Sequence, residues 1–228
     1  MPQRRPIVVE LAGVAGAGKS TLALALAQLD PTIRARPRVR EQSYLANVPS
    51  LVPTFLGLHW PFRGVLRKEM KRMLRVRTLY RMAQESTLDG TLLFDEGPVY
   101  MLARILMFGA DNTRSATFEQ WWRRTIAEWA ETLDVVVWLD APDDVLATRL
   151  HTRAQPHPLQ GAPDRAVTAF FRSYRDAFTR VLDELLSGGR PRLWTISTAA
   201  ATPSSAARAL LDRLHGLATP PRSVAEPA

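Results

Sequence analysis

The chain has 228 residues, of which 46% are hydrophobic and 23% charged, and its formal net charge is +8. A chain of this length and composition can bury the core of one α/β domain, and its basic balance suits an anionic ligand or partner. The absence of cysteine excludes disulfides and thiolate metal sites, and no apolar run approaches the roughly 20 residues of a membrane span.

The first predicted element is a buried strand at Ile7–Ala12, which leads into Gly13-Val-Ala-Gly-Ala-Gly-Lys-Ser20. This is the G-x-x-x-x-G-K-S pattern of a phosphate-binding loop, and a helical run follows it. The strand–loop–helix context disfavours the alternative, a glycine-rich turn that binds no nucleotide. Lys19 would reach the β- and γ-phosphates, and the Ser20 hydroxyl would hold Mg²⁺. The residues expected to contact the nucleotide are Gly13, Ala15, Gly16, Ala17, Gly18, Lys19, Ser20 and Thr21.

The first residues enter this strand directly, which leaves no room for a signal peptide and predicts a cytoplasmic protein without membrane contact. A second strand is expected at Arg38–Glu41. Glu41, at its end, is a candidate base for an acceptor hydroxyl, although a surface ion pair with Arg40 would also explain it. The proline- and aromatic-containing segment Leu45–Pro61 could wall an acceptor pocket.

A long helical pattern at Gly64–Glu85 is strongly basic. A solvated helix face explains such a run, but it could also bind an anionic acceptor, a nucleic-acid end or an acidic partner. No aromatic-interleaved RNA or DNA motif accompanies it, so nucleic acid is the less favoured partner. The basic residues are Arg63, Arg67, Lys68, Lys71, Arg72, Arg75, Arg77 and Arg81.

The third predicted strand, Leu92–Asp95, ends in the acids Asp95 and Glu96. In phosphate-binding-loop proteins, an Asp at this position commonly coordinates Mg²⁺, which makes Asp95 the second predicted metal ligand. Glu96 could polarise water, approach the substrate or serve as the acid instead. An acidic strand-end turn leading into the next helix is the alternative for both. Helices are predicted at Pro98–Gly109 and, opened by a capping box at Thr117-x-x-Gln120, up to Thr132.

A fourth strand at Val135–Leu139 is followed by a sharp turn and a helix that places Arg149 and Arg153 on one face. The proline-rich loop after it suits a lid near residues 149–165, which would bring both arginines to the transferring phosphoryl group. A solvated helix face is the alternative. A helix at Ala166–Leu186, a strand at Leu193–Ser197 and a helix at Pro203–Leu217 complete one domain over residues 1–217, and 218–228 is expected to be a disordered tail.

Three matches make the chain resemble the P-loop kinases of nucleosides and nucleotides, including thymidylate kinases. They are Gly13–Ser20, Phe94-Asp95-Glu96-Gly97, and the run from Leu139-Asp140-Ala141-Pro142 through Arg149 and Arg153. The resemblance implies a three-layer α/β fold with a five-stranded parallel sheet of order 2-3-1-4-5. It also implies ATP–Mg²⁺ as the donor and an adenine site near Ser197-Thr198-Ala199.

Two departures from that family concern the acceptor side. Ala12 stands where deoxynucleoside and thymidylate kinases usually carry a Glu before the first glycine, while Glu10 lies earlier. Their acid-plus-arginine motif after the third strand is replaced by Asp95-Glu96-Gly97. The sequence therefore predicts the donor better than the acceptor.

The predicted function is an ATP-dependent phosphotransferase that transfers the γ-phosphoryl group to a small molecule, a nucleoside, nucleotide or similar hydroxyl compound. A kinase acting on nucleic-acid ends and a nucleotide-dependent regulatory ATPase without an acceptor remain as alternatives. The identity of the acceptor, the choice between ATP and GTP, and a homodimer are left open.

Overall fold

The computed structural model describes residues 5–37, 41–58, 64–87, 89–109, 115–154, 156–188 and 190–218. Five parallel strands form one sheet in the order β2-β3-β1-β4-β5, which confirms the predicted α/β fold and strand order. The strands are β1 (Ile7–Ala12), β2 (Ile33–Ala35), β3 (Thr91–Phe94), β4 (Val135–Asp140) and β5 (Arg192–Ser197).

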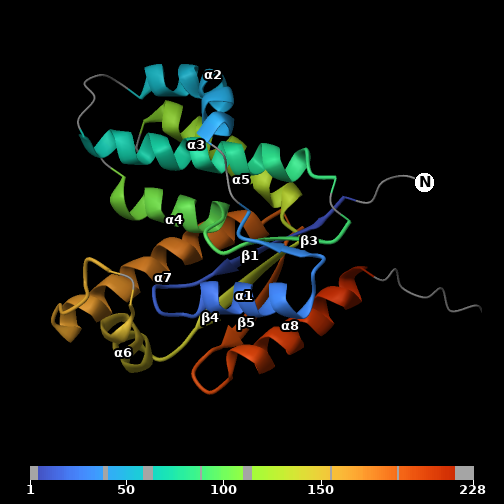
Figure 1. Ribbon diagram of the computed structural model, residues 1–228. Coiled ribbons are helices and arrows are strands. Elements are labelled where there is room, and N and C mark those ends of the chain that lie inside the picture. Colours follow the sequence, from blue (N-terminus) through green and yellow to red (C-terminus); the bar gives the residue numbers. More distant parts are fainter. Residues whose placement is uncertain are drawn as a thin grey trace, which may run out of the picture.

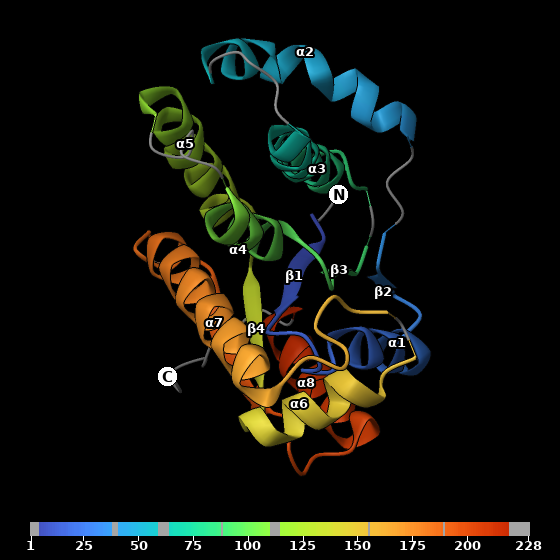
Figure 2. The same cartoon turned by 90° about the vertical axis from the view of Figure 1, so that its left-hand side faces the viewer.

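The helices cover both faces of this sheet (Figures 1 and 2). Helices α1 and α8 pack together on one face, and α4 and α7 pack together on the other, with α3 and α5 beside them. Helix α2 is the outermost and rests on α3 (Figure 2). Their bounds are α1 (Lys19–Leu29), α2 (Glu41–Gly57), α3 (Gly64–Gln84), α4 (Pro98–Phe108), α5 (Ala116–Thr132), α6 (Asp143–Thr152), α7 (Asp164–Leu186) and α8 (Pro203–Ala218).

The central strands are apolar because helices cover them on both faces. In β1, Val9 pairs in register with Leu93 of β3 and Val135 of β4, and all three side chains are fully buried. Parallel strands point their carboxyl ends to one edge of the sheet. The residues that follow β1, β3 and β4 therefore meet there, as ligand sites do in open α/β sheets.

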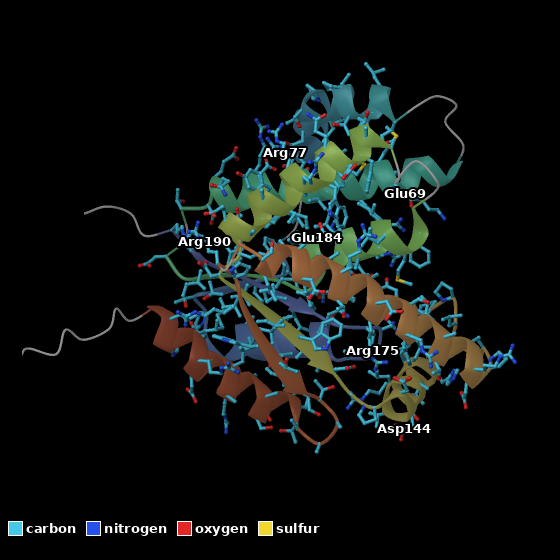
Figure 3. All side chains as sticks on the ribbon, turned by 180° about the vertical axis from the view of Figure 1, so that it is seen from behind. Glu69, Arg77, Asp144, Arg175, Glu184 and Arg190 are labelled. Atoms are coloured by element: carbon cyan, nitrogen blue, oxygen red, sulfur yellow. The ribbon has the colours of Figure 1, made fainter. Side chains whose placement is uncertain are left out.

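Polar contacts also join the helices of the α3–α5–α7 side (Figure 3). Arg77 of α3 lies 3.0 Å from both carboxylate oxygens of Glu128 on α5. Glu184 of α7 accepts a hydrogen bond from the indole of Trp122 on α5. The tryptophans of α5 pack in the core as expected, and Trp129 is fully buried.

Two local predictions were wrong. The second strand lies at Ile33–Ala35 rather than Arg38–Glu41, because a three-residue edge strand carries almost no hydrophobic pattern. Residues 38–40 lie outside the described residues, and Glu41 is the first residue of a helix. Ser115, not Thr117, caps α5 by accepting the Phe118 N–H at 3.1 Å. The predicted tail beyond Ala218 also lies outside the described residues.

Among the described residues, no helix is both long and apolar enough to cross a membrane.

Candidate functional site

The phosphate-binding loop connects β1 to α1 and folds around the side chain of Lys19. The ammonium donates hydrogen bonds to the carbonyl oxygens of Gly13 and Val14, at 2.7 and 3.0 Å. Gly13 has a φ of 145°, and a Cβ atom there would lie 2.3 Å from the Leu139 carbonyl oxygen, so only glycine fits. The loop ends at the N-terminus of α1, whose first turn holds no acidic residue. Its backbone amides and helix dipole suit an anion.

The surroundings of Lys19 lower the pKa of its ammonium group. Burial lowers its pKa to about 8, Glu96 and Asp95 oppose this effect, and Arg153 reinforces it. The side chain is therefore still mostly an ammonium at pH 7. Lys19 can thus serve as a cation for phosphate, and it lies within the electrostatic reach of three other predicted site residues.

A hydroxyl and a carboxylate meet beside the loop. Ser20 Oγ donates to Asp95 Oδ2 at 2.9 Å, and Asp95 directly follows β3 and is 6% exposed. Mg²⁺ in nucleotide sites takes one or two such side chains and completes its shell with phosphates and water. Among the described residues, no group of three or more His, Asp or Glu side chains could hold a metal ion. The donor set therefore fits Mg²⁺ that arrives with a nucleotide.

Arg36, which the sequence analysis did not single out, contacts the same carboxylate oxygen. Its Nε lies 2.9 Å from Asp95 Oδ2, and its backbone N–H donates to the Leu93 carbonyl at 3.0 Å. Its φ is 52°, the only positive value for a non-glycine among the described residues. Such a conformation persists where neighbouring contacts impose it. No sequence pattern marks this arginine among the many others.

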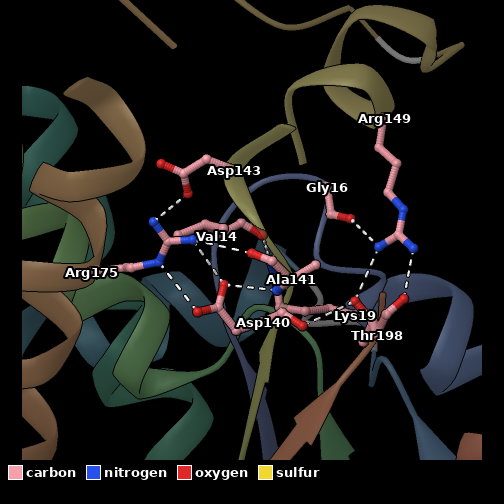
Figure 4. Close-up of polar contacts among 9 residues, drawn as sticks. All are labelled: Val14, Gly16, Lys19, Asp140, Ala141, Asp143, Arg149, Arg175 and Thr198. Carbon is pink, nitrogen blue, oxygen red and sulfur yellow. Dashed lines mark hydrogen bonds and ion pairs between the residues drawn. The ribbon is translucent and has the colours of Figure 1, made fainter. Parts of the chain in front are cut away.

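Helix α6 brings Arg149, the first of the two arginines predicted to lie on a lid, against the loop (Figure 4). Arg149 donates to the Thr198 Oγ1 and carbonyl oxygen at 3.0 and 2.7 Å, and it lies 3.5 Å from the Gly16 carbonyl. It therefore joins the phosphate-binding loop to the turn after β5, where the resemblance placed the adenine. Arg153, the C-cap of α6, lines the adjoining cleft.

Arg175 of α7 holds the start of α6 in place (Figure 4). Its guanidinium lies 3.1 Å from Asp140 Oδ1 and 2.7 Å from Asp143 Oδ1, and it donates to the Ala141 carbonyl at 3.3 Å. The Asp140 carbonyl in turn accepts the Thr198 N–H at 2.8 Å. Arg175 was missed because its partners are far away in the sequence.

Glu10 is buried in the middle of β1 and holds the N-terminus of α4. Its carboxylate accepts the N–H groups of Val99 and Tyr100 at 2.8 and 2.9 Å. A Cβ atom at Gly97 would lie 2.6 Å from the Glu10 Cδ, so this glycine gives the carboxylate its space. Burial raises the pKa of Glu10 to about 8, against the backbone donors and Lys19. A neutral carboxyl is therefore favoured at pH 7.

The two candidate bases are Glu96 and Glu41. Glu96 is exposed at the mouth of the site, with Oε2 3.4 Å from the Arg75 guanidinium. The side chain of Glu41 is not among those described, so its role stays a prediction.

A cleft of about 1270 Å³ opens from the phosphate-binding loop. Its far wall comes from α3, α4, α7 and the segment after α6. None of residues 45–58 lines this cleft, and residues 59–61 lie outside the described residues, so a wall from Leu45–Pro61 stays a prediction. Four aromatic side chains line the cleft. The ring of Tyr174 stacks on that of Tyr100, with 6.4 Å between the ring centroids, and its centroid lies 4.8 Å from that of Phe170 and 6.5 Å from that of Phe108. No sequence pattern marks this wall, because its apolar spacing is that of ordinary helix packing.

Three arginines of the basic helix α3 form ion pairs within the protein, whereas Lys68, Lys71 and Arg81 are exposed. Arg72 pairs with Glu69 at 2.5 Å, Arg75 with Glu96, and Arg77 with Glu128. Lys68 and Arg72 line the cleft. Residue 63 lies outside the described residues, and so does the side chain of Arg67. This arrangement favours the anionic-acceptor hypothesis over an open nucleic-acid surface.

No protein-family model matches the sequence, and no curated protein matches it. Solved structures do match. Deoxyadenosine kinase from M. mycoides with bound dCTP has a TM-score of 0.54 at 14% identity, covering 92% of this chain and 100% of that one. Thymidylate kinase from Candida albicans has a TM-score of 0.55 at 11% identity, with coverages of 94% and 93%. Shikimate kinase from Bacteroides thetaiotaomicron has a TM-score of 0.52 at 17% identity, with coverages of 92% and 98%.

The chain has the P-loop kinase fold. At these identities the likeness concerns the fold, and the predicted resemblance is confirmed at that level. Within the fold, the predicted site residues Lys19, Ser20, Asp95 and Arg153 all line the cleft, and their roles stay predictions. The structure adds Arg36, Arg175, Glu10 and the aromatic wall.

Proposed function

We propose that this protein is an ATP-dependent kinase that transfers the γ-phosphoryl group to a small molecule, such as a nucleoside, a nucleotide or a similar hydroxyl compound. One observation carries the proposal. The phosphate-binding loop, with Lys19 and the Ser20–Asp95 pair, opens directly into a cleft of about 1270 Å³ with an aromatic far wall. A regulatory ATPase needs only room for water beside the γ-phosphate, whereas a kinase needs a second compartment for its acceptor.

Each residue has a role in this scheme. The amides of the loop and Lys19 bind the donor phosphates, and Ser20 and Asp95 would hold Mg²⁺, which offsets charge on the β- and γ-phosphates when bound. Arg153, whose charge acts on Lys19, would stabilise the transferring phosphoryl group. Arg149 would position the donor from between Gly16 and Thr198. Glu96 or Glu41 would orient the acceptor.

The kinase activity can be tested with labelled ATP and a panel of acceptors. The kinases of similar fold act, by their names, on deoxyadenosine, thymidylate and shikimate. Nucleosides, nucleotides and hydroxy acids are therefore the first compounds to try. Lys19→Ala should abolish transfer to any acceptor that the wild type phosphorylates, because the γ-phosphate loses its cation.

Lys71→Ala is the matched control, since Lys71 is exposed on α3 and does not line the cleft. It should leave transfer unchanged, and unaltered circular dichroism would show that both variants fold. Normal turnover by Lys19→Ala would contradict the kinase proposal. ATP hydrolysis that no acceptor stimulates would favour the regulatory ATPase instead.

A further inference from the structure

Arg104 of α4 is held rigidly in the wall of the cleft. Its guanidinium donates to the Tyr100 hydroxyl at 2.8 Å and lies 5.6 Å from the centroid of that ring. It lies 5.3 Å from the centroid of Phe108. These two aromatic residues are one turn before and one turn after Arg104 on the same helix face. The guanidinium is thus fixed between neighbours and loses little freedom when it binds a ligand.

Arg104 differs from two of the other cleft arginines, Arg36 and Arg72, in having no counter-ion at salt-bridge distance among the described residues. Arg36 pairs with Asp95 and Arg72 with Glu69, and Arg149 is bonded to Thr198. Within the described part of the chain, Arg104 has no carboxylate at salt-bridge distance, and its hydrogen-bond partner is a neutral phenol. Burial raises the pKa of Tyr174, which also borders Arg104, so this phenol stays neutral as well. A half-buried guanidinium with spare N–H donors is a preformed site for an anion.

The charge of the whole cleft supports the same conclusion. Three carboxylates line it, from Glu69, Asp95 and Glu96, against seven cationic side chains. A magnesium-bound triphosphate adds roughly two negative charges, which leaves the loaded cleft still positive. The seven are Lys19, Arg36, Lys68, Arg72, Arg104, Arg149 and Arg153.

The anion site lies within reach of the donor site. The Lys19 ammonium is 5.8 Å and the Arg104 guanidinium 5.6 Å from the centroid of the same Tyr100 ring. The two cations are therefore at most about 11.4 Å apart. One small molecule can place an anionic group on Arg104 and a reacting oxygen at the γ-phosphate.

We propose that the acceptor is an anion, a phosphate monoester or a carboxylate, whose charged group binds Arg104 with Lys68 and Arg72 beside it. This inference rests on the proposed kinase function and names its substrate class. An oxygen of the acceptor forms the new bond to the γ-phosphorus as the bond to the β,γ-bridging oxygen breaks, and ADP leaves. If that oxygen is a hydroxyl, its proton passes to a cleft carboxylate or to water.

Matched pairs of acceptors test the proposal: nucleosides against their monophosphates, sugars against their phosphates, and hydroxy acids against their amides. Transfer from labelled ATP should be confined to the anionic member of a pair, and the pairs separate phosphate from carboxylate acceptors. Arg104→Met keeps the side-chain bulk and removes the charge. It should raise KM for the anionic acceptor about 10- to 100-fold, and Arg104→Lys should restore part of the loss.

Arg123→Met is the matched control, because Arg123 is exposed on α5 away from the cleft. It should behave like the wild type. Equal transfer to the neutral and charged members of a pair, or an unchanged KM in Arg104→Met, would overturn the proposal.

A binding measurement keeps this test separate from the kinase proposal. With saturating Mg²⁺–ADP to fill the donor site, inorganic phosphate should raise the melting temperature of the wild type but not of Arg104→Met. If no acceptor is phosphorylated, the kinase function fails, and this measurement alone judges the anion site. A wild type that phosphate does not stabilise would then overturn it.

Discussion

Asp95 shows how one buried carboxylate oxygen can have competing partners. Oδ2 accepts the Ser20 hydroxyl at 2.9 Å and lies 2.9 Å from the Arg36 guanidinium. Arg36 is about half exposed, so the ion pair is weak and screened by solvent. A cation that arrives with nucleotide would compete with this guanidinium for the Asp95 carboxylate.

Removing that competitor should strengthen metal binding. In Arg36→Met, the Mg²⁺ concentration that gives half-maximal thermal stabilisation with ADP should fall about threefold, because an exposed ion pair contributes less than about 1 kcal/mol. Arg34→Met is the control, since Arg34 is an exposed residue of β2, two positions before Arg36, and does not line the cleft. A higher Mg²⁺ requirement in Arg36→Met would show that the arginine supports the metal site.

Residues of this kind also mark the limit of sequence analysis. The positions of Lys19, Ser20 and Asp95 were predictable because local patterns place the first two at the start of the helix after β1 and the third directly after β3. Arg36 meets Asp95 and Arg104 meets Tyr100 only in the folded chain, and nothing in a sequence rich in arginine distinguishes these two from solvated positions. Their roles depend on which carboxylates lie nearby, and only the folded chain decides that.

At the level of elements, α4 depends on a close fit with β1. Gly97 precedes the helix, and a Cβ atom there would lie 2.6 Å from the Glu10 Cδ and 2.8 Å from the Phe94 Cβ. Gly97→Ala should therefore reduce the free energy of unfolding by about 1–3 kcal/mol, as overpacking does in a well-filled core. Gly188→Ala is the control, because its Cβ would meet only Ala130, at 3.9 Å. Equal urea midpoints for the two variants would contradict this fit.

The buried carboxyl at this junction also predicts a dependence of stability on pH. The pKa of Glu10 is raised by burial from 4.5 to about 8 in the folded protein. Between these values the folded state holds a proton that the unfolded state releases. The contribution of this proton to the free energy of unfolding is therefore complete below pH 4.5. It is lost as the pH rises through 8, by at most about 1.4 kcal/mol per pH unit.

Glu10→Gln removes the titration while keeping the size of the side chain. Urea unfolding of wild type and variant at pH 5, 6, 7 and 8 should show the wild type losing stability relative to the variant as pH rises. Parallel profiles would mean that Glu10 is ionised over this whole range.

For the whole molecule, the sheet order explains which part of the site was predictable. Order β2-β3-β1-β4-β5 sets β1 between β3 and β4, so the phosphate-binding loop, Asp95 and Asp140 meet at one edge. Residues that follow or end a strand in this way can be located from the short sequence motif that contains them. The far wall of the cleft is assembled from α3, α4 and α7, and the aromatic side chains of α4 and α7 have the same spacing as core residues. Sequence patterns therefore indicated the donor half and missed the other.

Arg175 links this edge of the sheet to helix α6, and we therefore expect its removal to weaken nucleotide binding although Arg175 does not line the cleft. It holds Asp140 and Asp143, the Asp140 carbonyl holds the Thr198 N–H, and Thr198 binds Arg149 beside the phosphate-binding loop. Arg175→Met should weaken Mg²⁺–ADP binding about 3- to 10-fold, because α6 and the turn after β5 lose their common anchor. The free energy of unfolding should fall only by about 1 kcal/mol, since all three side chains are partly exposed.

Arg172→Met is the control, because Arg172 is exposed on the same helix, and it should change neither the ADP affinity nor the free energy of unfolding. Calorimetric titration of both variants decides it: equal ADP affinities would mean that α6 is held in place without Arg175.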